Sequence, residues 1–197
     1  MDVVISKLKT IWKGRENIRT KARLVLLITV LLSSCDPPPI EPSCWATSPK
    51  LSLATEVRLK TLVQLRDEYK LIPYGIGGGM IDEIHCLALS FFYYKELDIE
   101  EGRKLLMTAA KVFLDNINKN EPIRKYLNHY PYRPRNIELR IFLKKPDGSE
   151  CDPDALCIIK VVEGKIEYEI DHDRRLITIY EESFEEAAEK VGLSFSL

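Results

Sequence analysis

The sequence predicts an α+β domain over residues 51–197, in which an antiparallel β-meander sheet carries helices packed mainly on one face. Apolar residues recur with a helical period in two stretches of the first half. Over residues 137–181 the period changes to two, and short turns separate the apolar runs. Short connections favour antiparallel pairing of these strands. A capped, acidic helix then follows the last strand.

The first predicted helix spans residues 54–69 and is followed by a break. Its apolar face is expected to hold Leu59, Leu62, Val63 and Tyr69. Pro73 and the glycine run at 75–79 end the helix, and we expect this run to form a tight turn with positive φ angles. Residues 84–94 are apolar on both faces, so their period alone does not separate a strand from a helix. The glycines before them favour a strand.

The second predicted helix runs from Asp98 to about residue 118. Asp98 and Glu101 have the spacing of a capping box at its start. Its apolar stripe consists of Leu105, Leu106, Ala109, Ala110, Phe113 and Ile117. Pro122 favours a short helix after it, and the prolines in residues 129–135 require an extended or turned segment.

The last third of the chain is predicted to contain strands joined by turns. Apolar and polar residues alternate in the strand segments, and Gly, Asp or charged residues mark the turns between them. These strands are residues 137–144, 156–162, 166–171 and 176–181. Ser183 caps the final helix at 184–191, and Gly192 ends it.

The charge of the chain is distributed unevenly. The composition, 45% hydrophobic and 30% charged, excludes a fully disordered, collagen-like or polytopic membrane protein. Residues 1–34 hold seven basic and two acidic side chains, a net charge of +5, and leave 22 basic and 28 acidic residues, a net charge of −6, for 35–197. Such an asymmetry indicates that the two parts meet different surroundings.

The boundary between these parts follows a short apolar run. Residues 24–34 are uncharged, but eleven residues fall short of the ~20 that a transmembrane helix needs, and they fit the apolar region of a secretory signal. Leu32-Ser33-Ser34-Cys35 resembles the lipobox of bacterial prolipoproteins. The resemblance implies cleavage between Ser34 and Cys35, a diacylglycerol thioether on Cys35, and acylation of its amine with a fatty acid such as palmitate. Two or three acyl chains suffice for stable anchoring.

Three alternatives stay open for the basic stretch before this run, which is longer than such signals usually carry. Its apolar residues fall near one face of a helix, which would suit an interfacial helix on anionic lipid. The true start could instead lie further downstream. The whole N-terminus could also stay uncleaved as a membrane-surface anchor.

Residues 35–50 form the predicted tether between the lipidated cysteine and the domain. Five of the eleven prolines lie here, and proline-rich chain favours an extended, semi-rigid spacer. An ordinary ragged terminus is the alternative. In the lipoproteins that the chain resembles, an Asp after the acylated cysteine favours the inner membrane, and Asp36 occupies that place. The expected location is therefore the extracytoplasmic or periplasmic face of a bacterial cell membrane.

Export would allow disulfides. Cys151 and Cys157 close a short loop between two predicted strands and could come within bonding distance. The alternative is that both are free thiols, with Cys157 a small apolar strand residue. Cys44 in the tether has no evident partner, and no CxxC motif occurs.

The segment around residue 130 is the candidate binding site, because aromatic and basic residues interleave there in a way that suits an anionic polymer or partner. Its members are Tyr130, Tyr132, Arg133 and Arg135. A structural loop is the alternative. Nucleic acid is not expected, because the domain is acidic. The phrases Gly77-Gly-Gly-Met80 and Tyr130-Pro-Tyr-Arg-Pro-Arg-Asn-Ile-Glu138 faintly resemble uncharacterised conserved domains of host-associated bacteria, which implies no activity.

The remaining motifs predict no catalytic residue, metal site or cofactor. The glycine run lacks the Lys-Ser/Thr of a phosphate loop. The three histidines are scattered, and the acidic residues of 147–154 do not match a calcium-loop spacing. The sequence therefore predicts a lipid-anchored lipoprotein with a non-catalytic binding or structural role in the cell envelope, whose partner is an unknown envelope protein or polymer. A lipid-tethered hydrolase of envelope polymers, with a site formed only in the fold, is the alternative.

Overall fold

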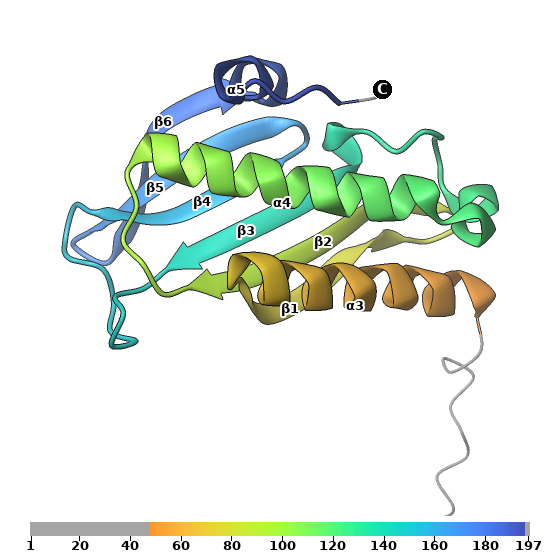
Figure 1. The fold of residues 1–197 in the computed structure, drawn as a ribbon, viewed down its shortest axis with the longest axis horizontal. Coiled ribbons are helices and arrows are strands. Elements are labelled where there is room, and N and C mark those ends of the chain that lie inside the picture. Colours follow the sequence, from red (N-terminus) through yellow and green to blue (C-terminus); the bar gives the residue numbers. More distant parts are fainter. Residues whose placement is uncertain (1–47, 196–197) are drawn as a thin grey trace, which may run out of the picture. The chain divides into compact units, whose positions relative to one another are not determined.

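A six-stranded sheet, with its strands in sequence order from β1 to β6, is the centre of the computed structural model, which describes residues 48–195 (Figure 1). Neighbouring strands are antiparallel except β2 and β3, which run parallel and are connected through α4. Helices α3 and α4 lie side by side over one face, and α5 lies beside α4 and β6. The predicted α+β meander with helices on one face is confirmed.

The helices and strands follow the predicted order, with one strand added. They are α3 (Pro49–Tyr69), β1 (Ile72–Met80), β2 (Ile84–Tyr93), α4 (Ile99–Lys119), β3 (Ile137–Leu143), β4 (Leu156–Val162), β5 (Lys165–His172), β6 (Arg175–Ser183) and α5 (Phe184–Val191). Two short 3₁₀ helices, η3 (Glu121–Tyr126) and η4 (Pro134–Asn136), lie between α4 and β3. None of the described helices is long and apolar enough to cross a membrane.

Strand β1 corrects the predicted turn. The glycine run is extended and pairs with β2, for example Gly75 with Ser90 and Gly77 with Ala88. Within this run only Gly78 has a positive φ, at 135°. The turn prediction was wrong because it considered only the conformational preference of glycine. β2 is apolar on both faces and has a strand on each side, so its backbone hydrogen-bonds with the glycine run and holds that run extended.

Helix α3 is confirmed, but its predicted apolar face was partly wrong. Leu59 is 53% and Val63 48% exposed, whereas Leu62 and Leu65 are buried. The buried face also takes polar residues: Thr61 accepts a hydrogen bond from Asn116 on α4, with Nδ2 and Oγ1 3.2 Å apart. This polar contact between the two helices shifts the buried stripe away from the face that the apolar residues alone predict.

Helices α4 and α5 begin with the predicted caps. Asp98 accepts from the Glu101 amide at 2.8 Å, and Ser183 accepts from the Glu186 amide at 3.1 Å. Most of the predicted α4 stripe is fully buried against the sheet. Gly192 ends α5 in the left-handed conformation that favours glycine.

A polar cluster around Glu182, here the Glu182 cluster, joins α4, β5, β6 and α5. The Glu182 side chain is 1% exposed, and its Oε1 lies 2.6 Å from both Arg103 Nε and the Tyr168 hydroxyl. Its Oε2 lies 2.7 Å from Lys190 Nζ. Burial alone would raise the pKa of Glu182, but hydrogen bonds from these three donors outweigh it and lower the pKa.

Arg58 on α3 is a buried charge with little compensation. It is 3% exposed, its Nε has no hydrogen-bond partner, and its Nη2 lies 3.7 Å from Met80 Sδ. Burial lowers the pKa of Arg58, although Tyr132 and Cys86 oppose the shift. Among residues 48–195 no carboxylate forms an ion pair with this guanidinium.

Arg58→Met is therefore expected to keep or raise the free energy of unfolding, by up to about 2 kcal/mol, because a side chain of similar length replaces an uncompensated buried charge. Urea denaturation followed by circular dichroism measures this. Arg66→Met is the matched control, because Arg66 is exposed and pairs only with Asp67. A loss of more than about 0.5 kcal/mol for Arg58→Met alone would contradict the expectation.

Candidate binding face

The helices of residues 48–195 cover one face of the sheet and leave the other open. In β3 the covered positions Ile137, Leu139, Ile141 and Leu143 are at most 1% exposed. The alternate positions Glu138, Arg140 and Phe142 are half-buried or exposed. Because side chains alternate across a strand, these residues and their neighbours in register form a second, helix-free face.

Aromatic side chains gather at one end of the helix-free face. Phe92 on β2 and Phe142 on β3 are partners in register, with ring centroids 5.8 Å apart. Tyr74 projects from the β1 bulge between Pro73 and Gly75, and its ring lies 4.4 Å from Phe92 and 5.5 Å from Phe142. Tyr94, just after β2, lies 6.4 Å from Phe92. We call these four residues the aromatic cluster.

The aromatic cluster is accessible to solvent. Tyr74 is 61% and Tyr94 43% exposed. The ring geometry is tilted or edge-on, the arrangement that aromatic pairs prefer. Lys144 Nζ lies 5.5 Å from the Phe92 ring centroid, within cation–π distance. The cluster therefore offers ring surfaces already held by one another and bordered by a cation.

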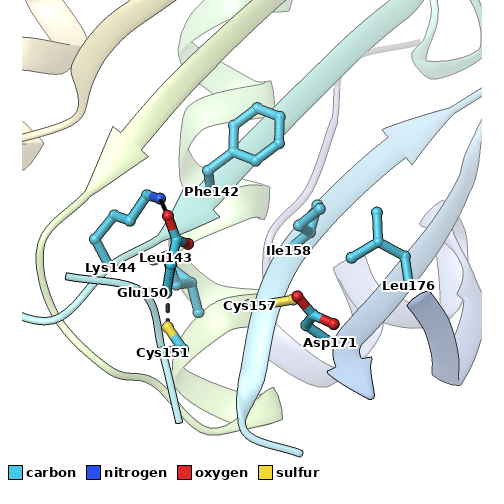
Figure 2. Close-up of a pocket in the computed structure, with 9 residues that line it drawn as sticks. All are labelled: Phe142, Leu143, Lys144, Glu150, Cys151, Cys157, Ile158, Asp171 and Leu176. Carbon is cyan, nitrogen blue, oxygen red and sulfur yellow. Dashed lines mark hydrogen bonds and ion pairs between the residues drawn. The ribbon is translucent and has the colours of Figure 1, made fainter. Parts of the chain in front are cut away.

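A cavity of about 110 Å³ adjoins the aromatic cluster and shares Phe142 with it (Figure 2). Its lining residues are Phe142, Leu143, Lys144, Glu150, Cys151, Cys157, Ile158, Asp171 and Leu176. Its volume is well below the ~300 Å³ of a typical small-molecule site, so it suits a side chain or a single functional group. Lys144 also pairs with Glu150 at its rim.

The two cysteines of the predicted disulfide face this cavity as free thiols. Cys151 Sγ lies 3.3 Å from the Leu143 carbonyl oxygen, and Cys157 Sγ lies 3.3 Å from that of Glu169. Burial raises the pKa of both thiols, that of Cys157 to about 11. Of the two alternatives from the sequence, this structure has the free thiols, which are protonated near neutral pH and therefore weak nucleophiles.

Charged residues on the centre of the helix-free face neutralise one another. Lys160 Nζ lies 2.6 Å from Glu169 and 2.9 Å from Glu167, and Arg140 lies 3.2 Å from Glu138. Burial would lower the pKa of Lys160, but the hydrogen bonds that its ammonium donates to Glu169 and Glu167 raise it overall. With these charges paired, the exposed apolar surface of the face lies at the aromatic cluster and at Leu176, which lines the adjoining cavity and is 57% exposed.

The structure separates the four residues of the predicted binding segment. Tyr132 is 2% exposed and its hydroxyl donates to the Ile84 carbonyl at 3.2 Å, so it belongs to the core. Tyr130 is 51% exposed, and its ring lies 4.7 Å from the Arg124 guanidinium. Only Arg133 and Arg135 come together, on the wall of a separate cavity of about 260 Å³.

The other motifs make no recognised chemical centre among residues 48–195. His172 Nδ1 lies 2.6 Å from Asp154 Oδ1, but both side chains are more than half exposed, and the other His172 nitrogen lies 3.9 Å from Asp173. Within the described part of the chain, no three His, Cys, Asp or Glu side chains are placed to hold a metal ion. The predicted lipid site at Cys35, the cleavage residue Ser34 and the tether cysteine Cys44 lie outside the described residues.

Sequence reasoning missed the aromatic cluster because its members come from separate elements. Tyr74 lies in the stretch predicted to turn, and Phe92 and Phe142 are neighbours only through the parallel pairing of β2 with β3. One signal was present: Phe142 occupies a polar-side position in an alternating strand, where an aromatic residue stands out. Comparisons of the chain with protein-family models, with curated proteins and with solved structures found no match.

Proposed function

We propose that this chain is a lipid-anchored bacterial lipoprotein of the cell envelope, whose domain has a non-catalytic binding role and engages its partner through the helix-free face. The observation that carries the binding role is the aromatic cluster, with Tyr74 61% exposed beside a cavity that can take a side chain. Exposed aromatic groups beside a small cavity are typical of protein interaction sites. The partner is an envelope protein, and the membrane is contacted through lipid on Cys35.

The anchor is tested on the mature protein. Mass spectrometry is expected to find Cys35 as the N-terminal residue with acyl chains attached, and Cys35→Ala is expected to move the protein out of the membrane fraction, because the acyl chains supply its membrane affinity. Cys44→Ala is the matched control and should stay with the membrane. An unmodified Cys35 within a longer chain would rule out the lipoprotein. Recovery in inner-membrane fractions would support the proposed effect of Asp36.

The binding face is tested by site-specific photo-crosslinking of the full-length protein in its native membrane. A photoreactive phenylalanine in place of Tyr74 is expected to give a discrete adduct. The same group in place of Tyr130 serves as the control, since Tyr130 is similarly exposed and lies outside the aromatic cluster. Adding Phe142→Ala should lower the yield of the Tyr74 adduct at least ~10-fold, because it removes the ring at the centre of the aromatic cluster. Equal adducts at both positions, or none at Tyr74, would refute this role.

A further inference from the structure

Two adjoining cavities lie at the opposite ends of the strands from the aromatic cluster and share none of its residues. One, of about 260 Å³, is charged, and the other, of about 290 Å³, is apolar. Both are lined by Pro134 and Glu185, so they meet at the first turn of α5. Together they reach the ~300–1,000 Å³ of small-molecule sites.

The charged cavity is lined by two basic and two acidic side chains that form no ion pair with one another. It is lined by the basic residues Arg133 and Arg135 and by the acidic residues Glu163 and Glu185. All four side chains belong to exposed residues, and none forms an ion pair within 4.0 Å in the described part of the chain. Elsewhere on this surface charged residues pair freely, for example Lys165 with Glu181. Unpaired groups of both signs at one cavity suit a ligand that carries both charges.

The backbone that presents these groups is fixed before any ligand binds. Asn136 is 5% exposed; its side chain accepts from the Arg133 amide at 3.2 Å and donates to the His85 carbonyl at 3.3 Å. Gly164, which also lines the cavity, accepts through its carbonyl from the Phe184 amide at 2.9 Å. Both walls are therefore tied to the sheet or to α5, which lowers the entropy cost of binding.

The apolar cavity supplies the second half of the site. Beyond the two shared residues it is lined by Phe184, Ala188, Leu193 and Phe195, with Glu189 at its edge. Phe184 and Phe195 are in edge-on contact, with centroids 4.8 Å apart, so the aromatic wall is ordered. An apolar group of moderate size on a ligand would leave water and contact this wall when it enters the cavity, which is favourable.

We infer that these cavities bind a zwitterion with an apolar side chain, that is, an apolar α-amino acid or a short peptide with free termini. Its carboxylate pairs with Arg133 and Arg135, its ammonium pairs with Glu163 and Glu185, and its side chain occupies the apolar cavity. Arginine suits the carboxylate because its planar guanidinium can donate two parallel hydrogen bonds. The inference does not depend on the proposed function, since the two sites share no residue.

Calorimetric titration of the full-length protein in detergent tests the inference. L-leucine and L-leucyl-L-leucine are the probes, and they distinguish a free amino acid from a peptide. Saturable binding of either one supports the inference if glycine and uncharged N-acetyl-L-leucinamide bind at least ~10-fold more weakly. No saturable heat with either probe at about 10 mM, or equal binding of N-acetyl-L-leucinamide, overturns it.

Two sets of variants locate the site. The double variant Arg133→Ala, Arg135→Ala is expected to weaken binding of the better probe at least ~10-fold, and Glu163→Gln with Glu185→Gln should do likewise. Arg175→Ala is the control, because Arg175 is an exposed arginine at the far end of β6. Circular dichroism checks that each variant is folded. Unchanged affinity in both double variants, or an equal loss in the control, refutes the assignment.

Discussion

Glu182→Ala is expected to lower the free energy of unfolding by about 3–5 kcal/mol, since it removes the buried carboxylate that buried Arg103, buried Tyr168 and exposed Lys190 share. Arg103 would lose its only ion-pair partner among the described residues while staying buried. Lys190, which fixes α5 to the cluster, would keep its hydrogen bond to the Tyr180 hydroxyl and lose its ion pair with Glu182. Urea denaturation followed by circular dichroism measures the loss.

Glu181→Ala is the matched control for this change. Glu181 is the adjacent residue in β6, but it is exposed, and its ion-pair partner in the described part of the chain is the exposed Lys165, so its loss should cost less than about 1 kcal/mol. Similar losses in the free energy of unfolding for the two variants would show that the buried Glu182 cluster stabilises the fold no more than an exposed ion pair does.

The Glu182 cluster also predicts how stability depends on pH. The pKa of Glu182 is lowered by folding, so its ionised form contributes stability above the unfolded-state value, near 4.5, and this contribution disappears as the pH falls through the lower folded-state pKa. The stability difference between the natural protein and Glu182→Gln should therefore shrink below that pH. A difference that stayed constant down to pH ~3 would contradict the lowered pKa.

Gly78→Ala is the second change with a large expected effect, a loss of about 3 kcal/mol or more in the free energy of unfolding. The φ of Gly78 is 135°, and an added Cβ would lie 2.2 Å from the Cys86 carbonyl oxygen. Because that oxygen belongs to the backbone of β2, the contact cannot be relieved by a rotamer change, and the end of the β1–β2 hairpin would have to move.

Gly79→Ala is the control next to it. An added Cβ at Gly79 has no neighbour within 4 Å, and its φ does not lie in the region that favours glycine. It should change stability by less than about 1 kcal/mol, in the same urea titration. If both substitutions cost the same, the effect would come from loss of glycine in the run and not from the conformation of Gly78.

Most of the fold could be predicted because local signals agree with it. The capping pairs at Asp98 and Ser183 locate the starts of α4 and α5 to the residue. The alternation in β3 predicts its first residue and its buried side, because one side faces helices and the other does not, and it places the end one residue late, at 144 instead of Leu143. In these elements propensity, pattern and packing favour the same structure.

The predictions that were wrong or missing depend on contacts between distant segments. No local pattern makes residues 75–79 a strand, since glycine alone favours a turn; β2 as a partner determines it. The separation of Tyr132 from Arg133 is of the same kind. Both belong to one aromatic and basic segment, but the Tyr132 hydroxyl donates to the carbonyl of Ile84, 48 residues away, whereas Arg133 stays at the surface beside Arg135.

The parallel pairing of β2 with β3 has a consequence for the order of events during folding. The pairs β1–β2, β4–β5 and β5–β6 are hairpins joined by short turns, so each pairing closes a small loop. β2 meets β3 across 50 residues, as in the pair Leu87 and Ile137, and α4 must be accommodated in that loop. Closing a long loop costs more chain entropy and comes later than local pairing. We therefore expect the residues of this pairing to govern the folding rate more than those of the hairpins.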